Sequence, residues 1–384
     1  MTSSPIRQET SAPKSSRLVS LDLLRGATIA GMILVNNPGN DSAYWPLKHA
    51  EWNGWTPTDL VFPFFLFMVG VALVYSFQSR IARGDSPHRL MMHTFQRAVT
   101  IFVIGVILNG LFEFHLSTWR IAGVLQRIAI CYLIASMFTL YASRRVRIGV
   151  IVGCLVGFWV LMRYVPVPGF GVPGQDIPIL HPDWNLTSWL DRKVMMGHLY
   201  EGTRDPEGIL STIPAIATCL LGVLTGEYLR SASTPLVKAR NLFFWGVAGL
   251  IAGKFWGIWF PINKKLWTSS YVLFVGGFAL VCLALCYWLV DVRGWKGKWK
   301  EPFLMFGTNA LTAYIVAELL AILGWTFSIE EAGRHLSVQG WVYQHVFRYL
   351  GDPAFGSLLF SLTFVLICLI PNWVLYRKKI FLKV

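Results

Sequence analysis

The sequence is poor in charged residues. Only 14% of its 384 residues are Asp, Glu, Lys or Arg, whereas soluble globular proteins carry about 25%. Apolar residues make up 54% of the chain, and a disordered polypeptide has few of them. The scarcity of charge therefore excludes a disordered protein and argues against a soluble enzyme.

Patterns that would bind a metal or form a disulfide framework are also missing. The six cysteines all lie in apolar stretches, with no CxxC pair and no cluster that has metal-ligand spacing. We interpret them as small buried apolar side chains, and we expect no metal cofactor.

Acidic residues are few relative to basic ones. The chain has 20 Asp and Glu against 34 Lys and Arg, a net charge of +14. In a soluble protein this excess suggests nucleic-acid binding. In a polytopic membrane protein it marks the cytoplasmic side instead, so the positions of the basic residues decide between the two.

Long apolar runs are what the sequence has in abundance. A helix needs about 20 mainly apolar residues to cross a bilayer. Ten segments meet this requirement: 20–38, 59–79, 98–114, 122–142, 148–166, 208–229, 241–260, 268–290, 302–324 and 354–376. We therefore predict an all-α, polytopic integral membrane bundle of about ten transmembrane helices, formed by one domain over 17–384.

The basic residues alternate between the connections. The two termini and every second loop hold 21 of the 34, and ten lie in or beside the other connections. Because Lys and Arg accumulate on the cytoplasmic side, both termini are predicted to be cytoplasmic and nucleic acid is not an expected partner. Residues 1–16 are polar and predicted to be a disordered tail, and the long connection 167–207 is predicted to be external.

The densest polar signal lies in the first two segments and the loop between them. Arg25 follows Asp22 by three residues near the cytoplasmic end, where the pair is either a salt bridge or a site for an anionic ligand. Asn36 ends the first segment. His49 lies in a Trp-rich external loop that ends at Asp59, and an imidazole there is suited to proton abstraction near neutral pH.

Further polar side chains lie in or next to the apolar segments. Intramembrane polar groups are candidates for function, although helix packing uses them too. Besides Asn53 in the His49 loop, the candidates are Gln126 and Arg127 in the fourth segment, Asp205 and Glu207 before the sixth, and Asn263 and Lys264 before the eighth.

Several blocks of the sequence carry a family resemblance. They read SLDLLRG, MILVNNPG, KHAEWNGWTPTDLVFPFFLF, RIAGVLQRIA, DPEGILSTI and PINKKLWTSSYVL, and they extend from about residue 17 to 315. Together they resemble the transmembrane acetyltransferase family that includes heparan-alpha-glucosaminide N-acetyltransferase. The LDLLRG block is also similar to the first helix of the wider acyltransferase-3 group.

The resemblance implies transfer of an acetyl group from cytoplasmic acetyl-CoA, a co-substrate, to the amine of a glucosamine-type sugar or glycan on the external face. It implies a catalytic role for His49 and a supporting role for Asn36. Basic and amide groups would hold acetyl-CoA, namely Arg25, Gln126 and Arg127. The acceptor would be bound by a second set, Asp59, Asn53, Asp205, Glu207, Asn263 and Lys264.

Two questions stay open at this level. An alternative function is an inner-membrane transporter for an amino sugar such as N-acetylglucosamine, which would not need acetyl-CoA. The chain is expected in the bilayer of a bacterial inner (plasma) membrane. A homodimer agrees with the resemblance, but we see no clear dimerisation face on any predicted helix.

Overall fold

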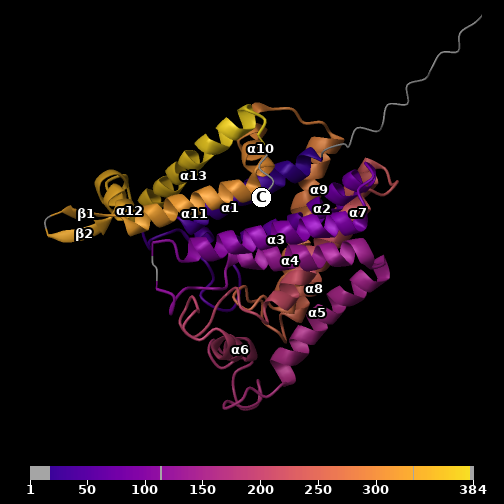
Figure 1. Cartoon of the computed structure of the whole chain (residues 1–384), viewed down its shortest axis with the longest axis horizontal. Coiled ribbons are helices and arrows are strands. Elements are labelled where there is room, and N and C mark those ends of the chain that lie inside the picture. The colour runs from indigo at the N-terminus through magenta and orange to yellow at the C-terminus, as the bar shows by residue number, and fades with distance from the viewer. Residues whose placement is uncertain (1–17, 113–114, 332, 381–384) are drawn as a thin grey trace, which may run out of the picture.

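A computed structural model describes residues 18–380, apart from 113, 114 and 332. The tail predicted to be disordered, residues 1–16, lies outside the described residues. The described chain is a bundle of long helices (Figure 1), and its one sheet is a two-stranded antiparallel hairpin of β1 (Ser328–Glu331) and β2 (Arg334–Ser337). The predicted all-α membrane class is confirmed.

Thirteen α-helices form the described bundle: α1 Val19–Asn36, α2 Val61–Ile81, α3 Pro87–Asn109, α4 Val124–Tyr141, α5 Arg144–Tyr164, α6 Leu186–Val194, α7 Thr212–Leu229, α8 Pro235–Trp256, α9 Ser269–Tyr287, α10 Glu301–Thr308, α11 Ala310–Thr326, α12 Val338–Val342 and α13 Pro353–Arg377. Short 3-10 turns lie at Trp45–Leu47, Pro57–Leu60 and Lys298–Lys300, and π-helical turns follow α9 and α12 at Trp288–Val292 and Tyr343–Phe347.

All ten predicted transmembrane segments contain helix. Among the described residues, eight helices are long and apolar enough to cross a membrane, and α10 with α11 adds a ninth if the bent pair counts as one span. The remaining segment, 241–260, corresponds to α8, whose 22 residues include Lys238, Arg240 and Lys254. These three cations lower its mean hydropathy.

Two predicted segments differ from the observed helices. The third was expected at 98–114, but α3 begins at Pro87, behind the capping hydroxyl of Ser86, and ends before Gly110. The ninth was expected to be continuous over 302–324, but the chain bends by 81° at Asn309, between α10 and α11. The polar first turn of α3 and the single non-helical residue Asn309 give weak sequence signals compared with the long apolar pattern around them.

The centre of the bundle is formed by α2 and α7. In the most apolar stretch of each, 67% of the residues are buried, against 22% in α13. The two helices approach closely because Gly70 and Gly222 face each other. A Cβ on Gly222 would lie 1.9 Å from the carbonyl oxygen of Phe67. Small residues commonly allow such close contacts between membrane helices.

The long connection before α7 folds over one end of the bundle. It contains α6, which lies at the lower edge of Figure 1, away from the hairpin. The indole Nε1 of Trp52, in the loop that carries His49, donates a hydrogen bond of 2.6 Å to the carbonyl oxygen of Leu180. This layer therefore supports the loop between α1 and α2, and we refer to this side as the His49 end.

Candidate active site

His49 and Asp59 form the centre of the candidate site. The imidazole Nδ1 lies 2.7 Å from the Oδ1 of Asp59, and the carboxylate is 1% exposed whereas the His49 side chain is 42% exposed. A buried carboxylate on Nδ1 fixes the orientation of the ring. The Nε2 atom is thereby left as the ring nitrogen available for proton transfer or for acetylation.

The local sequence holds Asp59 in place. Thr56 and Asp59 form a capping box at the 3-10 turn that precedes α2, with the backbone N–H of Thr56 donating to Asp59 Oδ2 at 3.0 Å. The backbone N–H of Ala50 donates to the same oxygen at 3.0 Å. Because both ends of the loop bond to this one carboxylate, His49 is brought next to it.

Lys264 completes the cluster from the loop between α8 and α9. Its Nζ lies 3.2 Å from Nδ1 and 3.5 Å from Nε2 of His49, and 4.0 Å from Oδ1 of Asp59. Burial lowers the pKa of the Lys264 ammonium, and the nearby Asp59 carboxylate acts in the opposite direction. A proton donor and two proton acceptors therefore lie within one small space.

Asn53 and Asn263, both predicted to bind the acceptor, contact each other. Asn263 Nδ2 donates to Asn53 Oδ1 at 3.2 Å, and the backbone N–H of Gly54 donates to the carbonyl oxygen of Ile262 at 2.8 Å. These bonds join the His49 loop to the Lys264 loop. In this structure the two amides position the loops.

Asp205 and Glu207, also predicted to bind the acceptor, are engaged elsewhere. Arg120 holds Asp205 with two hydrogen bonds of 2.9 and 2.8 Å and Glu207 with one of 2.7 Å. Burial alone would lower the pKa of Arg120, but the two carboxylates raise it. No described hydrogen bond or ion pair joins them to His49, because their charges neutralise the buried guanidinium.

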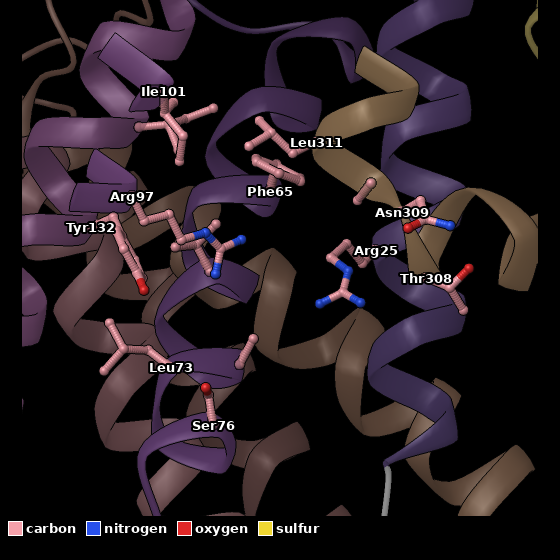
Figure 2. A pocket seen from close by; sticks show the side chains of 14 residues that line it. Arg25, Phe65, Leu73, Ser76, Arg97, Ile101, Tyr132, Thr308, Asn309 and Leu311 are labelled. Atoms are coloured by element: carbon pink, nitrogen blue, oxygen red, sulfur yellow. The ribbon is translucent and has the colours of Figure 1, made fainter. Parts of the chain in front are cut away.

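Arg25 lies apart from the His49 cluster and lines a cavity of about 180 Å³ between the helices (Figure 2). Its Nη2 bonds to Asp22 Oδ1 at 2.7 Å and its Nε donates to the carbonyl oxygen of Gly307 at 2.8 Å. The side chain is thus both in a salt bridge and at the wall of a cavity. The salt bridge is confirmed, and the binding of an anionic ligand at Arg25 stays a prediction.

The wall opposite Arg25 carries an arginine that the sequence did not single out. Figure 2 shows Arg97 of α3 and Arg25 of α1 with their guanidinium groups turned toward the same space. The predicted third segment begins at residue 98, which leaves Arg97 in the preceding loop. A start at Ser86 and Pro87 would have placed Arg97 well inside the helix.

The cavity follows one face of α2. Its lining from this helix recurs at helical spacing: Phe65, Val69, Ala72, Leu73 and Ser76. The 11-residue interval from Phe65 to Ser76 corresponds to about 16 Å of helix. The chain break at Asn309 and the ring of Tyr132 complete the wall. The lining therefore follows about three turns of α2, and in Figure 2 the two guanidinium groups lie between the levels of Phe65 and Ser76.

Gln126 and Arg127, predicted to hold acetyl-CoA with Arg25, do not line this cavity. Arg127 is 1% exposed. Its Nη2 donates to the carbonyl oxygen of Gly208 at 3.1 Å and to the hydroxyl of Ser211, and the guanidinium lies over the Trp267 ring at 5.1 Å. It lies at the start of α4, near the His49 end, and joins α4 to the segment before α7.

Asn36 is the last residue of α1, and its side chain is exposed at the same end of the bundle. The next residue, Asn37, is buried and donates to the carbonyl oxygen of Ile33 at 2.8 Å. Among the described contacts, no hydrogen bond joins Asn36 to His49. The structure brings together His49, Asp59 and Lys264, and the supporting role of Asn36 stays a prediction.

Comparison with known proteins identifies related chains. A family model described as heparan-alpha-glucosaminide N-acetyltransferase, catalytic, matches residues 17–252. The human heparan-alpha-glucosaminide N-acetyltransferase is 30% identical over 422 aligned residues, which cover 96% of this chain and 60% of the human protein. The mouse protein of that name is 28% identical over 438 residues, covering 100% and 63%. The chain thus spans less than two thirds of these relatives' length.

Proposed function

Since the chain belongs to the heparan-alpha-glucosaminide N-acetyltransferase family, we propose that it transfers an acetyl group from acetyl-CoA to the amine of a glucosamine-type sugar. The reaction would take place within a bacterial inner (plasma) membrane. The observation that carries this proposal is the His49–Asp59 pair at 2.7 Å, in which a buried carboxylate fixes the ring of the candidate base.

The donor would enter from the side of the membrane that is predicted to be cytoplasmic and reach Arg25 and Arg97 in the cavity. Its phosphates would bind the guanidinium groups of Arg25 and Arg97, since Arg binds phosphate oxygens through charge-assisted hydrogen bonds. The narrow pantetheine arm would follow the face of α2 toward Phe65, which lies six residues after Asp59. The basic residues near the Arg25 end support a cytoplasmic location for this entrance.

The transfer itself would take place at the His49 end. The Nε2 atom of His49 would remove a proton from the acceptor ammonium, and the freed amine would attack the thioester carbon. The new N–C bond would form as the C–S bond breaks, and the CoA thiolate would take the proton from His49. His49 would then accept the second proton that the nitrogen loses and release it to water. Alternatively, His49 would first accept the acetyl group covalently and then pass it to the amine, and the geometry supports this route as well.

Asn36 would contribute by donating a hydrogen bond to the developing oxyanion. Donors of this kind are worth about 3–4 kcal/mol in catalysis. Its exposed position at the end of α1 supports a role toward a bound substrate, because the side chain is not part of the packed core.

The test is a transfer assay with isotopically labelled acetyl-CoA and glucosamine on membranes that contain the full chain. We expect His49→Ala to lower kcat by about 100-fold or more, as for loss of a general base. His335→Ala is the matched control, because His335 is exposed in the β hairpin. Wild-type transfer by His49→Ala protein that is inserted normally would show that the proposed base is wrong.

A transporter is the second candidate function, and one observation favours it. The break at Asn309 bends α10 against α11 by 81°, and discontinuous helices line the substrate sites of many transporters. This function predicts that vesicles accumulate labelled glucosamine or N-acetylglucosamine without acetyl-CoA. Uptake without acetylation would therefore favour the transporter over the transferase.

A further inference from the structure

The side chain of Lys264 places a primary amine beside the proposed catalytic base. We propose that Lys264 is an acetylation site of this protein, modified by its own active site when no amino sugar is bound. The inference rests on the proposed function, because the acetyl group must reach His49 first.

The distances support a reaction between Lys264 and an acetyl group at His49. The Nζ of Lys264 lies 3.5 Å from His49 Nε2, the ring nitrogen that Asp59 leaves open. Reacting atoms in productive intramolecular arrangements are about 3–3.5 Å apart. An acetyl carbon on or next to Nε2 would therefore be within reach of this amine without a movement of the loop.

The Lys264 loop is fixed in this position. Asn263, which precedes Lys264, is fully buried, and its Oδ1 accepts a hydrogen bond of 2.9 Å from the backbone N–H of Leu266. Its Nδ2 bonds to Asn53 at 3.2 Å, and its backbone N–H donates to the hydroxyl of Thr268 at 3.0 Å. A held amine reacts as if it were present at very high local concentration.

The protonation state of the Lys264 amine also favours the reaction. Burial lowers the pKa of Lys264, although Asp59 opposes this change. A larger share of the side chain is consequently in the neutral, nucleophilic form than for a solvated lysine. His49 can accept the proton that the remaining ammonium must lose.

The chemistry needs only the donor of the proposed reaction. The amine of Lys264 attacks the acetyl carbon of the thioester, an N–C bond forms, the C–S bond breaks, and the released thiolate takes the proton that the amine loses through His49. The product is an amide, which has no positive charge and does not return its acetyl group to a sugar. The modification would therefore stop the enzyme when acceptor is scarce.

Lys265 supplies an internal comparison. It is the next residue, yet its Nζ bonds to Glu201 at 2.9 Å and lies 5.9 Å from the centre of the Trp52 ring. No described contact joins Lys265 to His49. Acetylation directed by the active site should therefore select Lys264 over Lys265, whereas unspecific chemical acetylation should favour the more exposed Lys265.

The experiment incubates the full chain in membranes with labelled acetyl-CoA and without sugar, followed by peptide mass spectrometry after cleavage by chymotrypsin. We expect label on Lys264 to exceed that on Lys265 by about tenfold or more. Label on Lys264 should disappear in His49→Ala and should fall when glucosamine is added. The variant Lys264→Arg keeps the charge and should leave only the minor label on Lys265.

Three results would overturn the inference. Glucosamine acetylation with Lys264 unlabelled would remove the inference and leave the proposed function intact. Equal label on Lys264 in the wild type and in His49→Ala would show chemical acetylation without the active site. Absence of both sugar and lysine acetylation would remove the proposed function together with the inference.

Discussion

Arg97 is the residue on which the donor site depends most directly. Arg25 is tied to Asp22 and to the backbone of α10, so its removal also disturbs packing. Arg97 lies on the other side of the cavity and is exposed. It therefore offers the cleaner test of charge in that cavity.

We expect Arg97→Ala to raise the KM for acetyl-CoA by about ten- to a hundredfold, since a hydrogen bond to a charged group is worth about 1.5–3 kcal/mol. The KM for S-acetyl-pantetheine, which lacks the nucleotide and its phosphates, should not change. Initial rates at varied donor concentration measure both. Arg83→Ala, an exposed arginine after α2, is the control. An equal loss with both donors would contradict a phosphate contact.

The structure brings only some of the predicted site residues together. The sequence pointed to His49 and Asp59 as candidates, and they lie ten positions apart in one short loop, where a local capping box decides their contact. Asp205 and Glu207 were assigned to the acceptor, but Arg120 binds both from 85 or more positions away. Ion pairs between residues so far apart produce no periodic pattern in a single sequence, so they could not be predicted from it.

At the scale of helices, the contact of α2 with α7 should be sensitive to any added side chain. A Cβ on Gly222 would lie 1.9 Å from the Phe67 carbonyl oxygen, so Gly222→Leu must push the two helices apart. We expect a loss of about 3 kcal/mol or more, at the upper end for overpacking, seen as a lower melting temperature in detergent. Gly149→Leu in α5, where nothing lies within 4 Å, should be nearly neutral. Equal melting temperatures for the two variants would contradict this packing.

The helices themselves were predicted in position but not in every detail. Apolar runs predicted where helices form, because every backbone polar group in a bilayer must be bonded within the helix. They did not predict that the segment 302–324 is broken at Asn309 or that α3 begins at Pro87. Both features depend on one or two polar residues within an apolar pattern.

At the scale of the whole molecule, we expect the acetyl donor and the acceptor to bind from opposite sides of the membrane. The distribution of basic residues and the opposite positions of Arg25 and His49 predict that donor and acceptor enter from different sides. In inside-out vesicles that expose the cytoplasmic face, acetyl-CoA added outside should acetylate glucosamine enclosed in the lumen. Product is measured after vesicle lysis and separation.

The reverse arrangement provides the control for this polarity. In right-side-out vesicles, external acetyl-CoA should support no transfer, because the donor cannot cross the bilayer. Rapid acetylation of glucosamine that is supplied only on the side of acetyl-CoA, in sealed vesicles, would contradict a site that opens to opposite sides.

The amino-acid sequence alone predicted the all-α membrane class, the approximate limits of most long apolar helices, the sidedness of the loops and the segment that carries the candidate base. These follow from composition and periodicity, because the free energy of placing a residue in a bilayer depends mainly on that residue and its neighbours along the helix. Only the tertiary structure decided which charges neutralise each other, that Arg97 faces Arg25, and that Lys264 reaches His49 from 215 positions away. Such contacts arise when separate helices and loops pack together, and the bonding partners of a polar group are settled only at that stage.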